Sequence, residues 1–226
     1  MRNQHISIII PVLNEGGGIE NFLSALQPMR GRGHEIIAVD GFSEDDTAEK
    51  AKTLSDAVIS EARGRARQMN RGAQMASGGI FWFLHADGIP PENADEMILN
   101  AIDRGRIWGR FDIKLTGSNF IFRIIETLMN LRSRITGIAT GDQGIFVRSD
   151  IFKKIGGFQE IPIMEDIALS KMLKKLGRPS CLKNHITSSS RRWKNYGIIR
   201  TVLTMWYLRL LYALGVNPQK LKGHYR

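Results

Sequence analysis

The chain has 226 residues, enough for one domain of ample size or for one domain with a C-terminal extension. A single cysteine, Cys181, excludes an internal disulfide framework and any zinc site built from several cysteines, and it is consistent with a reducing compartment. The net charge of +10 is unevenly distributed: residues 1–166 carry 19 Lys or Arg against 22 Asp or Glu, whereas residues 167–226 carry 13 Lys or Arg and no acid. This basic final quarter predicts contact with an anionic surface: a membrane, a nucleic acid or a phosphate-bearing substrate.

The first half of the chain alternates between strand-like and helix-like segments. Short runs rich in apolar residues predict strands at residues 5–13, 34–40, 57–60 and 80–85. The intervals predict helices, the last of them over residues 64–77. Because the first apolar run is short and ends in Asn14-Glu15, we expect no signal peptide. Strands and helices that alternate with ordinary loops predict a parallel sheet with helices on both faces.

Polar residues follow three of these strands at the point where each strand ends. The fourth strand stops just before Asp87, and two earlier strands end at Asn14-Glu15 and at Asp40. In a parallel sheet these three loops lie on the same carboxyl edge, where open α/β sheets bind ligands. Taken alone, Asp87 is better explained as the cap of the helix that follows it. The convergence of the three strand ends instead favours a binding role for Asp87.

The second half of the chain is less regular. Its patterns predict a helix over 91–102, a strand over 106–115, a helix over 120–138, a loop entering a strand over 140–147, and helices over 149–155, 164–176 and 198–216. Asp166 lies three and seven residues before Leu169 and Leu173, so we expect its carboxylate to face the protein rather than solvent. A carboxylate in such a place is unusual unless it serves binding or catalysis.

Several motifs of this chain resemble, in the same order, those of family 2 glycosyltransferases. They are Ile8-Ile-Ile-Pro11-Val-Leu-Asn14-Glu15, Val39-Asp40-Gly41-Phe-Ser43-Glu-Asp-Asp-Thr47, Leu84-His-Ala-Asp87, Gly141-Asp-Gln-Gly144, Gly156-Gly157-Phe158, Glu165-Asp166 and Ser189-Ser-Arg-Arg192-Trp193. The chain is similar in particular to a small bacterial subgroup with Leu-His-Ala-Asp and Arg-Arg-Trp signatures. The resemblance implies the GT-A fold, a Rossmann-like, mostly parallel α/β sheet flanked by helices. We therefore expect a glycosyltransferase domain over 1–190, with a nucleotide-sugar half (1–115) and an acceptor half (116–190), and a basic, apolar helical tail over 191–226.

The resemblance assigns nucleotide-sugar binding to residues near the strand ends: Pro11, Val12, Glu15, Asp40, Ser43 and Ala86. In this assignment Asp40 accepts a hydrogen bond from the imide N–H of the base, although a turn or cap residue is the simpler reading of Asp40 alone. Arg63, Arg67 and Arg71 recur every four residues, and we expect Arg67 to reach the diphosphate. A solvated, charged helix face is the alternative for these arginines.

Asp87 falls where the family has the second acid of its metal-binding Asp-x-Asp motif, and His85 stands in place of the first acid. The resemblance implies that Asp87 ligates a divalent cation, Mn²⁺ or Mg²⁺, that bridges both phosphates and stabilises the departing nucleoside diphosphate. Whether His85 contacts the metal or the sugar, or is only a structural histidine, is left open.

The resemblance places the general base at the second acid of Glu165-Asp166. Asp166 would deprotonate the acceptor hydroxyl, which gives single displacement with inversion, and Glu165 would support it. The residues expected on the acceptor side are Gly141, Asp142, Gln143, Arg192 and Trp193. Ser189 stands where processive members of the family have glutamine, so we expect a single sugar addition.

The apolar segment 198–216 is nearly long enough to span a bilayer, but Arg200 and Arg209 interrupt it. We expect either an interfacial helix with Trp and Tyr at the headgroup level, or a helix packed on the domain or in a homodimer. The protein is accordingly expected in the cytoplasm, and in the first case at the inner face of the membrane. A lipid-linked acceptor would explain such a tail.

The function expected from these features is the inverting transfer of a sugar, from a nucleotide diphosphate sugar to a hydroxyl acceptor. The resemblance favours a uridine diphosphate sugar. A nucleotidyltransferase on the same fold is an alternative, but the glycines after Asn14 lack the basic residue that such enzymes place there. A nucleic-acid-binding protein that uses the basic tail would leave Asp40, Asp87 and Asp166 unexplained, so we expect no nucleic-acid partner.

Overall fold

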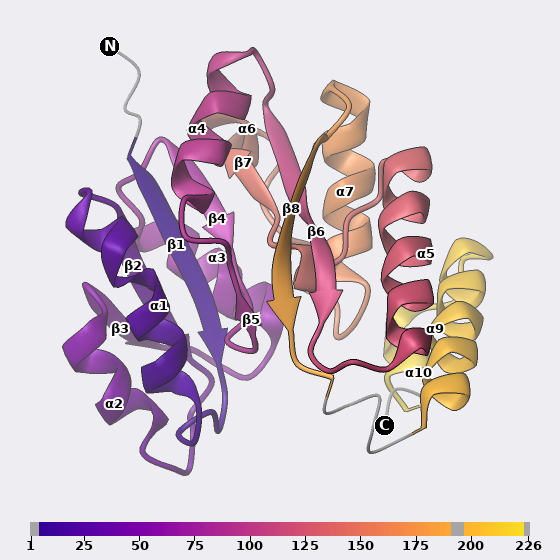
Figure 1. Ribbon diagram of the computed structural model, residues 1–226, viewed down its shortest axis with the longest axis horizontal. Helices are drawn as coiled ribbons and strands as arrows, with labels where there is room; N and C mark the ends of the chain where they lie inside the picture. Colours follow the sequence, from indigo (N-terminus) through magenta and orange to yellow (C-terminus); the bar gives the residue numbers. More distant parts are fainter. Residues whose placement is uncertain (1–4, 191–196, 224–226) are drawn as a thin grey trace.

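The computed structural model describes residues 5–190 and 197–223 and has a mixed α/β fold (Figure 1). The strands that it describes form one sheet in the order β3-β2-β1-β4-β7-β6-β8-β5. Their bounds are β1 (Ile6–Val12), β2 (Glu35–Asp40), β3 (Ala57–Ser60), β4 (Ile80–Phe83), β5 (Gly88–Ile89), β6 (Trp108–Leu115), β7 (Phe146–Arg148) and β8 (Ser180–Ser188). The helices are α1 (Ile19–Gly31), α2 (Thr47–Leu54), α3 (Arg65–Met75), α4 (Ala94–Asp103), α5 (Phe120–Thr136), α6 (Ser149–Lys154), α7 (Glu165–Leu176), α9 (Ile198–Ala213) and α10 (Pro218–Lys222).

The first four strands pair in parallel, which confirms the expected parallel, Rossmann-like arrangement. β1 lies between β2 and β4. From β1 the sheet extends to β2 and β3 on one side and to β4 on the other, so the strand order reverses at β1. Val12, at the carboxyl end of β1, pairs with Asp40 at the carboxyl end of β2. The loops after β1, β2 and β4 therefore lie on one edge, and the switch point between β1 and β4 opens there.

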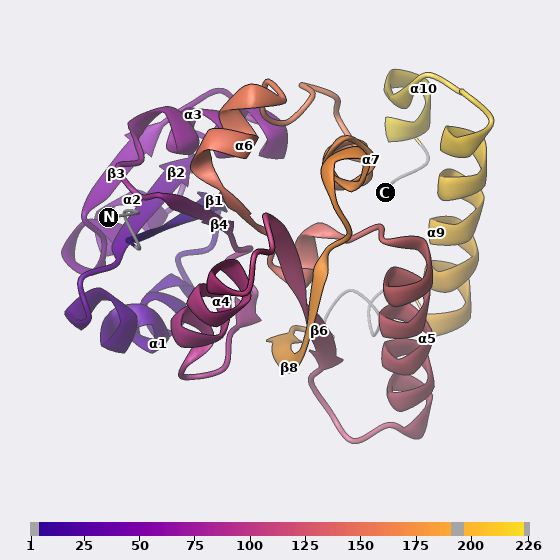
Figure 2. The ribbon, with the colours of Figure 1, turned by 90° about the horizontal axis from the view of Figure 1, so that it is seen from above.

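Helices cover both faces of the sheet because the buried strands are apolar on both sides. On one face, α1, α2 and α4 pack over Ile8 and Ile10 of β1; on the other, α3, α6 and α7 pack over Ile9. Figure 2 shows these two helical layers on either side of the sheet. β4 is buried along its whole length, as its run of apolar residues predicts. It ends at Phe83, two residues earlier than expected, because only the backbone N–H of Leu84 continues the pairing with β1.

The second half of the sheet departs from the parallel pattern. β7 runs antiparallel to both β4 and β6, and this reversal brings the loop before β7 to the carboxyl edge. β8 pairs in parallel with β6 and was not expected, because three exposed polar residues, Lys183, Asn184 and His185, interrupt its apolar pattern. The carboxyl ends of β6 and β8 also meet at this edge, so the Gly141-Asp142 loop that the sequence predicts on the acceptor side lies near the strand ends predicted to bind the donor.

The C-terminal helices pack on the domain. Leu208 of α9 and Leu221 of α10 are buried against the segment that leads into α7, and Val202 packs against α5. Figure 2 shows α9 alongside α5, with α10 on the side of α7. α9 ends at Ala213, three residues before the expected end, and α10 was not expected. Within residues 5–190 and 197–223, no helix has the length and hydropathy needed to cross a bilayer.

Candidate active site

A cleft of about 1470 Å³ opens at the carboxyl edge of the sheet. Its walls come from the loop after β4, the loop before β7, the first turn of α7, and the helices α5 and α9. The charged and imidazole side chains that line it include Arg65, His85, Asp87, Arg132, Asp142, Glu165, Asp166 and Arg209. The structure therefore brings together the predicted metal ligand, both predicted catalytic acids and two of the residues predicted on the acceptor side.

Asp166 lies in the first turn of α7, on the side of that helix that faces the protein, as its helical spacing predicted. Its carboxylate accepts hydrogen bonds from the backbone N–H groups of Gly141 (2.9 Å) and Ile167 (2.7 Å). Burial raises the pKa of Asp166 despite these two bonds, and the nearby charge of Asp142 acts in the same direction. The result is a half-buried carboxyl group that is fixed in place and lines the cleft.

Glu165 is the more buried of the two acids, with 7% of its surface exposed. Burial raises the pKa of Glu165 to about 7, and the adjacent charge of Asp166 adds to this effect. The residue before the pair, Met164, adopts a left-handed conformation with φ of 68° at the start of α7. This turn places two carboxyl groups with raised pKa values side by side at the cleft, an arrangement that is common where acid–base chemistry occurs.

His85 and Asp87 enter the cleft from the end of β4. Burial, with the charge of Arg65 acting in the same direction, lowers the pKa of His85 to about 3, so the imidazole is neutral at physiological pH. Gly141 packs against this ring so closely that a Cβ atom there would lie 2.5 Å from Cε1. Asp87 is exposed. Among the described residues no three His, Cys, Asp or Glu side chains cluster as a metal site.

Most of the residues predicted to bind the nucleotide lie at the ends of β1 and β2, whereas Ala86 follows β4 and Arg67 lies on α3. None of them is among the described residues that line the cleft. Asp40 is 4% exposed, and its carboxylate accepts hydrogen bonds from the backbone N–H and the hydroxyl of Ser43. The hydroxyl oxygen of Ser43 in turn accepts a bond from the N–H of Asn14, and Thr47 accepts one from Glu15. These bonds tie the loops after β1 and β2 together, so Asp40 holds this turn in place.

Gln68 of α3 was not singled out in the sequence, although it has a central place at this edge. It is 4% exposed, and its amide donates hydrogen bonds to the carbonyl groups of Val12 (3.0 Å) and Val39 (2.7 Å). One side chain thus joins the ends of two neighbouring strands. Its position after Arg67 in an arginine-rich segment gave no signal of this role, since the partners are backbone atoms.

Two arginines, one in the turn before α3 and one on α3, form ion pairs with acids from distant segments. Arg63 forms an ion pair with Glu44 (2.7 Å), and Arg67 forms one with Glu160 (3.0 Å). Both arginines are exposed, so the expected contact of Arg67 with a diphosphate stays a prediction. Arg65, two residues from each of these along the chain, is the arginine of this segment that lines the cleft.

The loop before β7 contains the 3₁₀ turn η1 (Gly141–Gln143). Gly141 and Asp142 line the cleft, whereas Gln143 is fully buried and its side-chain oxygen accepts a hydrogen bond from the N–H of Thr140. Gly144, with φ of 58°, accepts a hydrogen bond on its carbonyl oxygen from the Trp82 indole. Arg192 and Trp193, which were expected on the acceptor side, lie outside the described residues.

The Gly156-Gly157-Phe158 motif has a structural explanation. The side-chain amide of Asn70 donates to the carbonyl of Phe158, and the N–H of Phe158 donates to Asn70 Oδ1, both at 2.9 Å. Gly157 has φ of 75°, and a Cβ atom there would lie 2.7 Å from Asn70 Oδ1. The glycine thus permits a paired contact that holds α3 against the segment leading to α7.

Comparison with known proteins agrees with this arrangement. The sequence profile described as "Glycosyl transferase family 2" matches residues 7–155. The dolichol-phosphate mannosyltransferase of Pyrococcus furiosus is 34% identical over 107 residues, which cover 44% of this chain and 30% of the relative. The chain spans 30% to 55% of the length of four curated relatives that it matches.

Two solved structures share the fold. S. aureus TarS in complex with UDP-GlcNAc superposes with a TM-score of 0.67 at 20% identity, covering 83% of this chain and 59% of TarS. Glucosyl-3-phosphoglycerate synthase from Mycobacterium tuberculosis, in complex with Mn²⁺, UDP and glucosyl-3-phosphoglycerate, superposes with a TM-score of 0.61 at 18% identity, covering 81% of this chain and 70% of the synthase. Because the family profile extends over more than half of the residues, the chain belongs to glycosyl transferase family 2.

Proposed function

We propose that this glycosyltransferase moves one sugar, with inversion, from a nucleotide diphosphate sugar to a hydroxyl acceptor that binds in the cleft. The observation that carries the proposal is the position of Asp166. Its carboxylate lines the cleft and is held by the N–H groups of Gly141 and Ile167. Burial raises its pKa, which suits a group that must accept a proton during the reaction.

In the proposed reaction the acceptor oxygen attacks the anomeric carbon of the donor sugar while Asp166 takes the hydroxyl proton. A new bond forms between the acceptor oxygen and the anomeric carbon, and the bond from that carbon to the phosphate oxygen breaks. Its electron pair leaves with the nucleoside diphosphate. Glu165, with a pKa of about 7, is partly protonated at neutral pH, so it limits the negative charge beside the base.

We place the donor at the switch point beside β1, with the base between the loops that follow β1 and β2. Pro11, Val12, Glu15, Asp40, Ser43, Ala86 and Arg67 are the proposed donor-binding residues. Hydrogen bonds from Ser43 engage the carboxylate of Asp40, and each of its oxygens keeps a second lone pair for a base N–H. A uridine diphosphate donor is supported by the TarS complex with UDP-GlcNAc, which shares this fold.

A divalent cation fits the residues at the end of β4. Asp87 offers an exposed carboxylate, and the low pKa of His85 keeps a neutral imidazole beside it in the same cleft. Mg²⁺ is commonly held by one or two carboxylates together with substrate phosphates, so a single Asp is a sufficient protein ligand. When bound, such a cation would neutralise charge on the departing diphosphate, and Mn²⁺ is present in the fold relative from M. tuberculosis.

We further propose that the acceptor is lipid-linked and that α5 and α9 contact the membrane surface. Both helices expose apolar stripes: Phe120, Ile121, Ile124, Leu128, Leu131 and Ile135 on α5, and Leu203, Trp206, Tyr207 and Leu210 on α9, which Leu214 continues just after the helix. Several of these side chains also line the cleft, which thereby opens between them. The basic final quarter of the chain supplies charge complementary to anionic lipids. One relative, the dolichol-phosphate mannosyltransferase of Pyrococcus furiosus, is named for a lipid phosphate.

Thermal unfolding in the presence of nucleotides tests the donor site. We expect UDP and UDP-GlcNAc, each with MnCl₂ and at a concentration of 100 times its Kd, to raise the melting temperature by about 5 to 10 °C. At that concentration, binding adds about 2.7 kcal/mol to the free energy of unfolding. Asp87→Asn should weaken the manganese-dependent part of this shift. Asp150→Asn is the matched control, since Asp150 is an exposed acid paired with Arg148 outside the cleft. No stabilisation of the wild-type protein by any nucleotide, with or without manganese, would contradict the donor assignment.

Vesicle co-sedimentation tests the membrane contact separately. The wild-type protein should bind vesicles that contain phosphatidylglycerol, and should bind pure phosphatidylcholine vesicles less well. Trp206→Ser should reduce this binding, whereas Met75→Ser, which changes an exposed apolar residue on α3, should not. If the wild-type protein does not bind the anionic vesicles, α5 and α9 do not contact a membrane in this way.

A further inference from the structure

Arg132 of α5 is a charged side chain that no part of the mechanism above uses. It lines the cleft, and its Nε and Nη2 atoms are withdrawn from solvent without a hydrogen-bond partner among the described residues. Burial, together with the positive charge of Arg209, lowers the pKa of Arg132 to about 10, so the guanidinium is still charged at neutral pH. A buried cation with unpaired N–H groups is costly, and such groups in native proteins usually have a partner.

The neighbours of Arg132 do not supply that partner. Arg209 of α9 lines the same cleft and carries a like charge. Asp142 and Asp166 act on Arg132 through their charge, but neither forms an ion pair with it within the described residues. Asp166 is already held by backbone N–H groups. Arg110 adds a further positive charge, and its own partner is Asp112. This wall of the cleft thus contains two arginines, and neither forms an ion pair with a carboxylate of the described residues.

The position of this pair separates it from the donor side. Arg132 and Arg209 come from α5 and α9, on the side of the cleft that the acceptor half and the tail provide. Most of the proposed donor residues lie at the ends of β1 and β2, and none of them is on α5 or α9. An anion held by Arg132 and Arg209 would therefore belong to the acceptor, with its reacting hydroxyl toward Asp166.

We infer that Arg132 and Arg209 form a binding site for a phosphate group on the acceptor. A guanidinium binds phosphate through two parallel N–H donors, which is what the unpaired Nε and Nη2 atoms of Arg132 offer. The inference rests on the proposed function, because it takes the cleft to be the acceptor site. The phosphate could be carried by a lipid headgroup or by a small soluble phosphate ester, and both present the same group to the two arginines.

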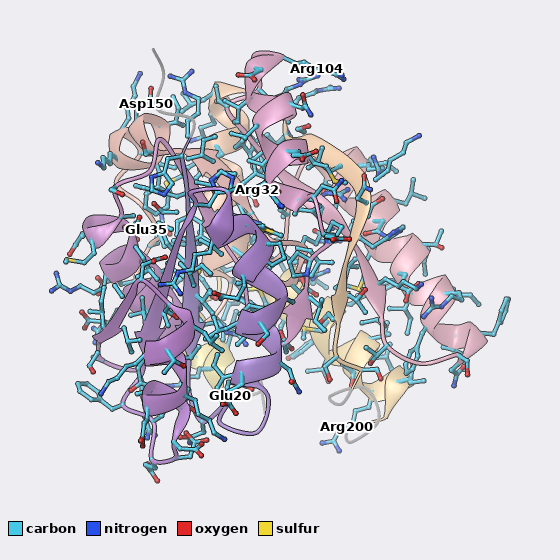
Figure 3. All side chains as sticks on the ribbon, turned by 60° about the vertical axis from the view of Figure 1, so that its left-hand side comes forward. Glu20, Arg32, Glu35, Arg104, Asp150 and Arg200 are labelled. Carbon is cyan, nitrogen blue, oxygen red and sulfur yellow. The ribbon has the colours of Figure 1, made fainter. Side chains whose placement is uncertain are left out.

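The test measures binding of phosphate probes by calorimetry at constant ionic strength. The probes are inorganic phosphate, glycerol 3-phosphate and the short isoprenoid citronellyl phosphate. We expect the wild-type protein to bind a phosphate ester, and Arg132→Gln and Arg209→Gln each to weaken that binding about ten-fold or more. Arg104→Gln is the matched control, because Arg104 is exposed and Figure 3 shows it at the opposite end of the molecule from Arg200 at the start of α9. Tighter binding of citronellyl phosphate than of glycerol 3-phosphate identifies a lipid source, and the reverse order a soluble one.

The melting temperature of the ligand-free protein gives a second readout. Replacing an arginine that served only the structure would lower it. Because Arg132 has no described partner, Arg132→Gln should leave the melting temperature of the free protein unchanged or raise it. Binding of UDP with manganese should also be unchanged in this variant. Wild-type phosphate affinity in Arg132→Gln, a lower melting temperature, or a selective loss of UDP binding would each overturn the inference. If instead the wild-type protein binds phosphate esters but no nucleotide, the proposed function fails while the phosphate site stands.

Discussion

Replacing Glu165 with glutamine tests whether a buried carboxyl group at the cleft costs stability. Glu165 is 7% exposed, and burial, with the charge of Asp166 acting in the same direction, raises its pKa from 4.5 to about 7. An acid whose pKa is higher in the folded state favours folding when protonated, so the stability is highest below about pH 4.5 and falls as the pH rises to about 7. Each pKa unit corresponds to about 1.4 kcal/mol, so the shift lowers the free energy of unfolding by about 3 kcal/mol at pH 8.

We therefore expect Glu165→Gln to be more stable than the wild-type protein by up to about 3 kcal/mol at pH 8, and about equal to it at pH 4. Urea denaturation followed by circular dichroism at several pH values, without nucleotide or metal, measures this difference. Glu160→Gln is the control, because Glu160 is exposed and forms only a surface ion pair with Arg67. If the difference in the free energy of unfolding between Glu165→Gln and the wild-type protein is the same at pH 8 and pH 4, the pKa of Glu165 is not raised in the folded protein.

Two further substitutions probe the scaffold, one at the amino edge of the sheet and one at the site. Asp95→Asn should lower the free energy of unfolding by about 3 kcal/mol, because Asp95 is 1% exposed and accepts two hydrogen bonds from Arg32, at 2.6 and 2.8 Å; chemical denaturation at pH 7 measures the loss. Gly141→Ala should cost about 1 to 3 kcal/mol and reduce transfer, because the added Cβ atom would lie 2.5 Å from the His85 ring and displace the N–H that holds Asp166. Unchanged stability and activity in Gly141→Ala would show that this loop is not closely packed.

The parts of the fold that depend on local pattern could be predicted from the sequence. The apolar runs and Gly-rich turns of the first half predicted β1 to β4 and their parallel order, which the pairing of β1 with β2 and β4 confirms. β8 could not be predicted in this way, because its pairing with β6 depends on contacts between segments about 70 residues apart, such as Gly109 with Ser180. The inward orientation of Asp166 was predictable, since it follows from helical spacing alone.

The ion-pair partners of charged side chains could not be predicted from the sequence. The arginine spacing around α3 was consistent with a diphosphate site, but Arg63 and Arg67 pair with Glu44 and Glu160, which come from other parts of the chain. Arg132 could not be identified from the sequence. What distinguishes it is the lack of a described hydrogen-bond partner, and this depends on how the helices pack. The acid that would ligate a metal, Asp87, was identified by its place after β4, and its role stays a prediction.

The most direct test of the account is the Asp166→Asn variant. Donor binding, measured by calorimetry with UDP-GlcNAc and manganese, should stay within about two-fold of the wild-type value, because we place Asp166 on the acceptor side of the cleft. Release of nucleoside diphosphate from the donor, with acceptor present, should fall about 100-fold or more, as expected when a general base is removed. Asp142→Asn, which changes an adjacent acid that lines the same cleft, should reduce the rate much less. An Asp166→Asn variant that binds donor and releases the nucleotide at the wild-type rate would contradict the central claim.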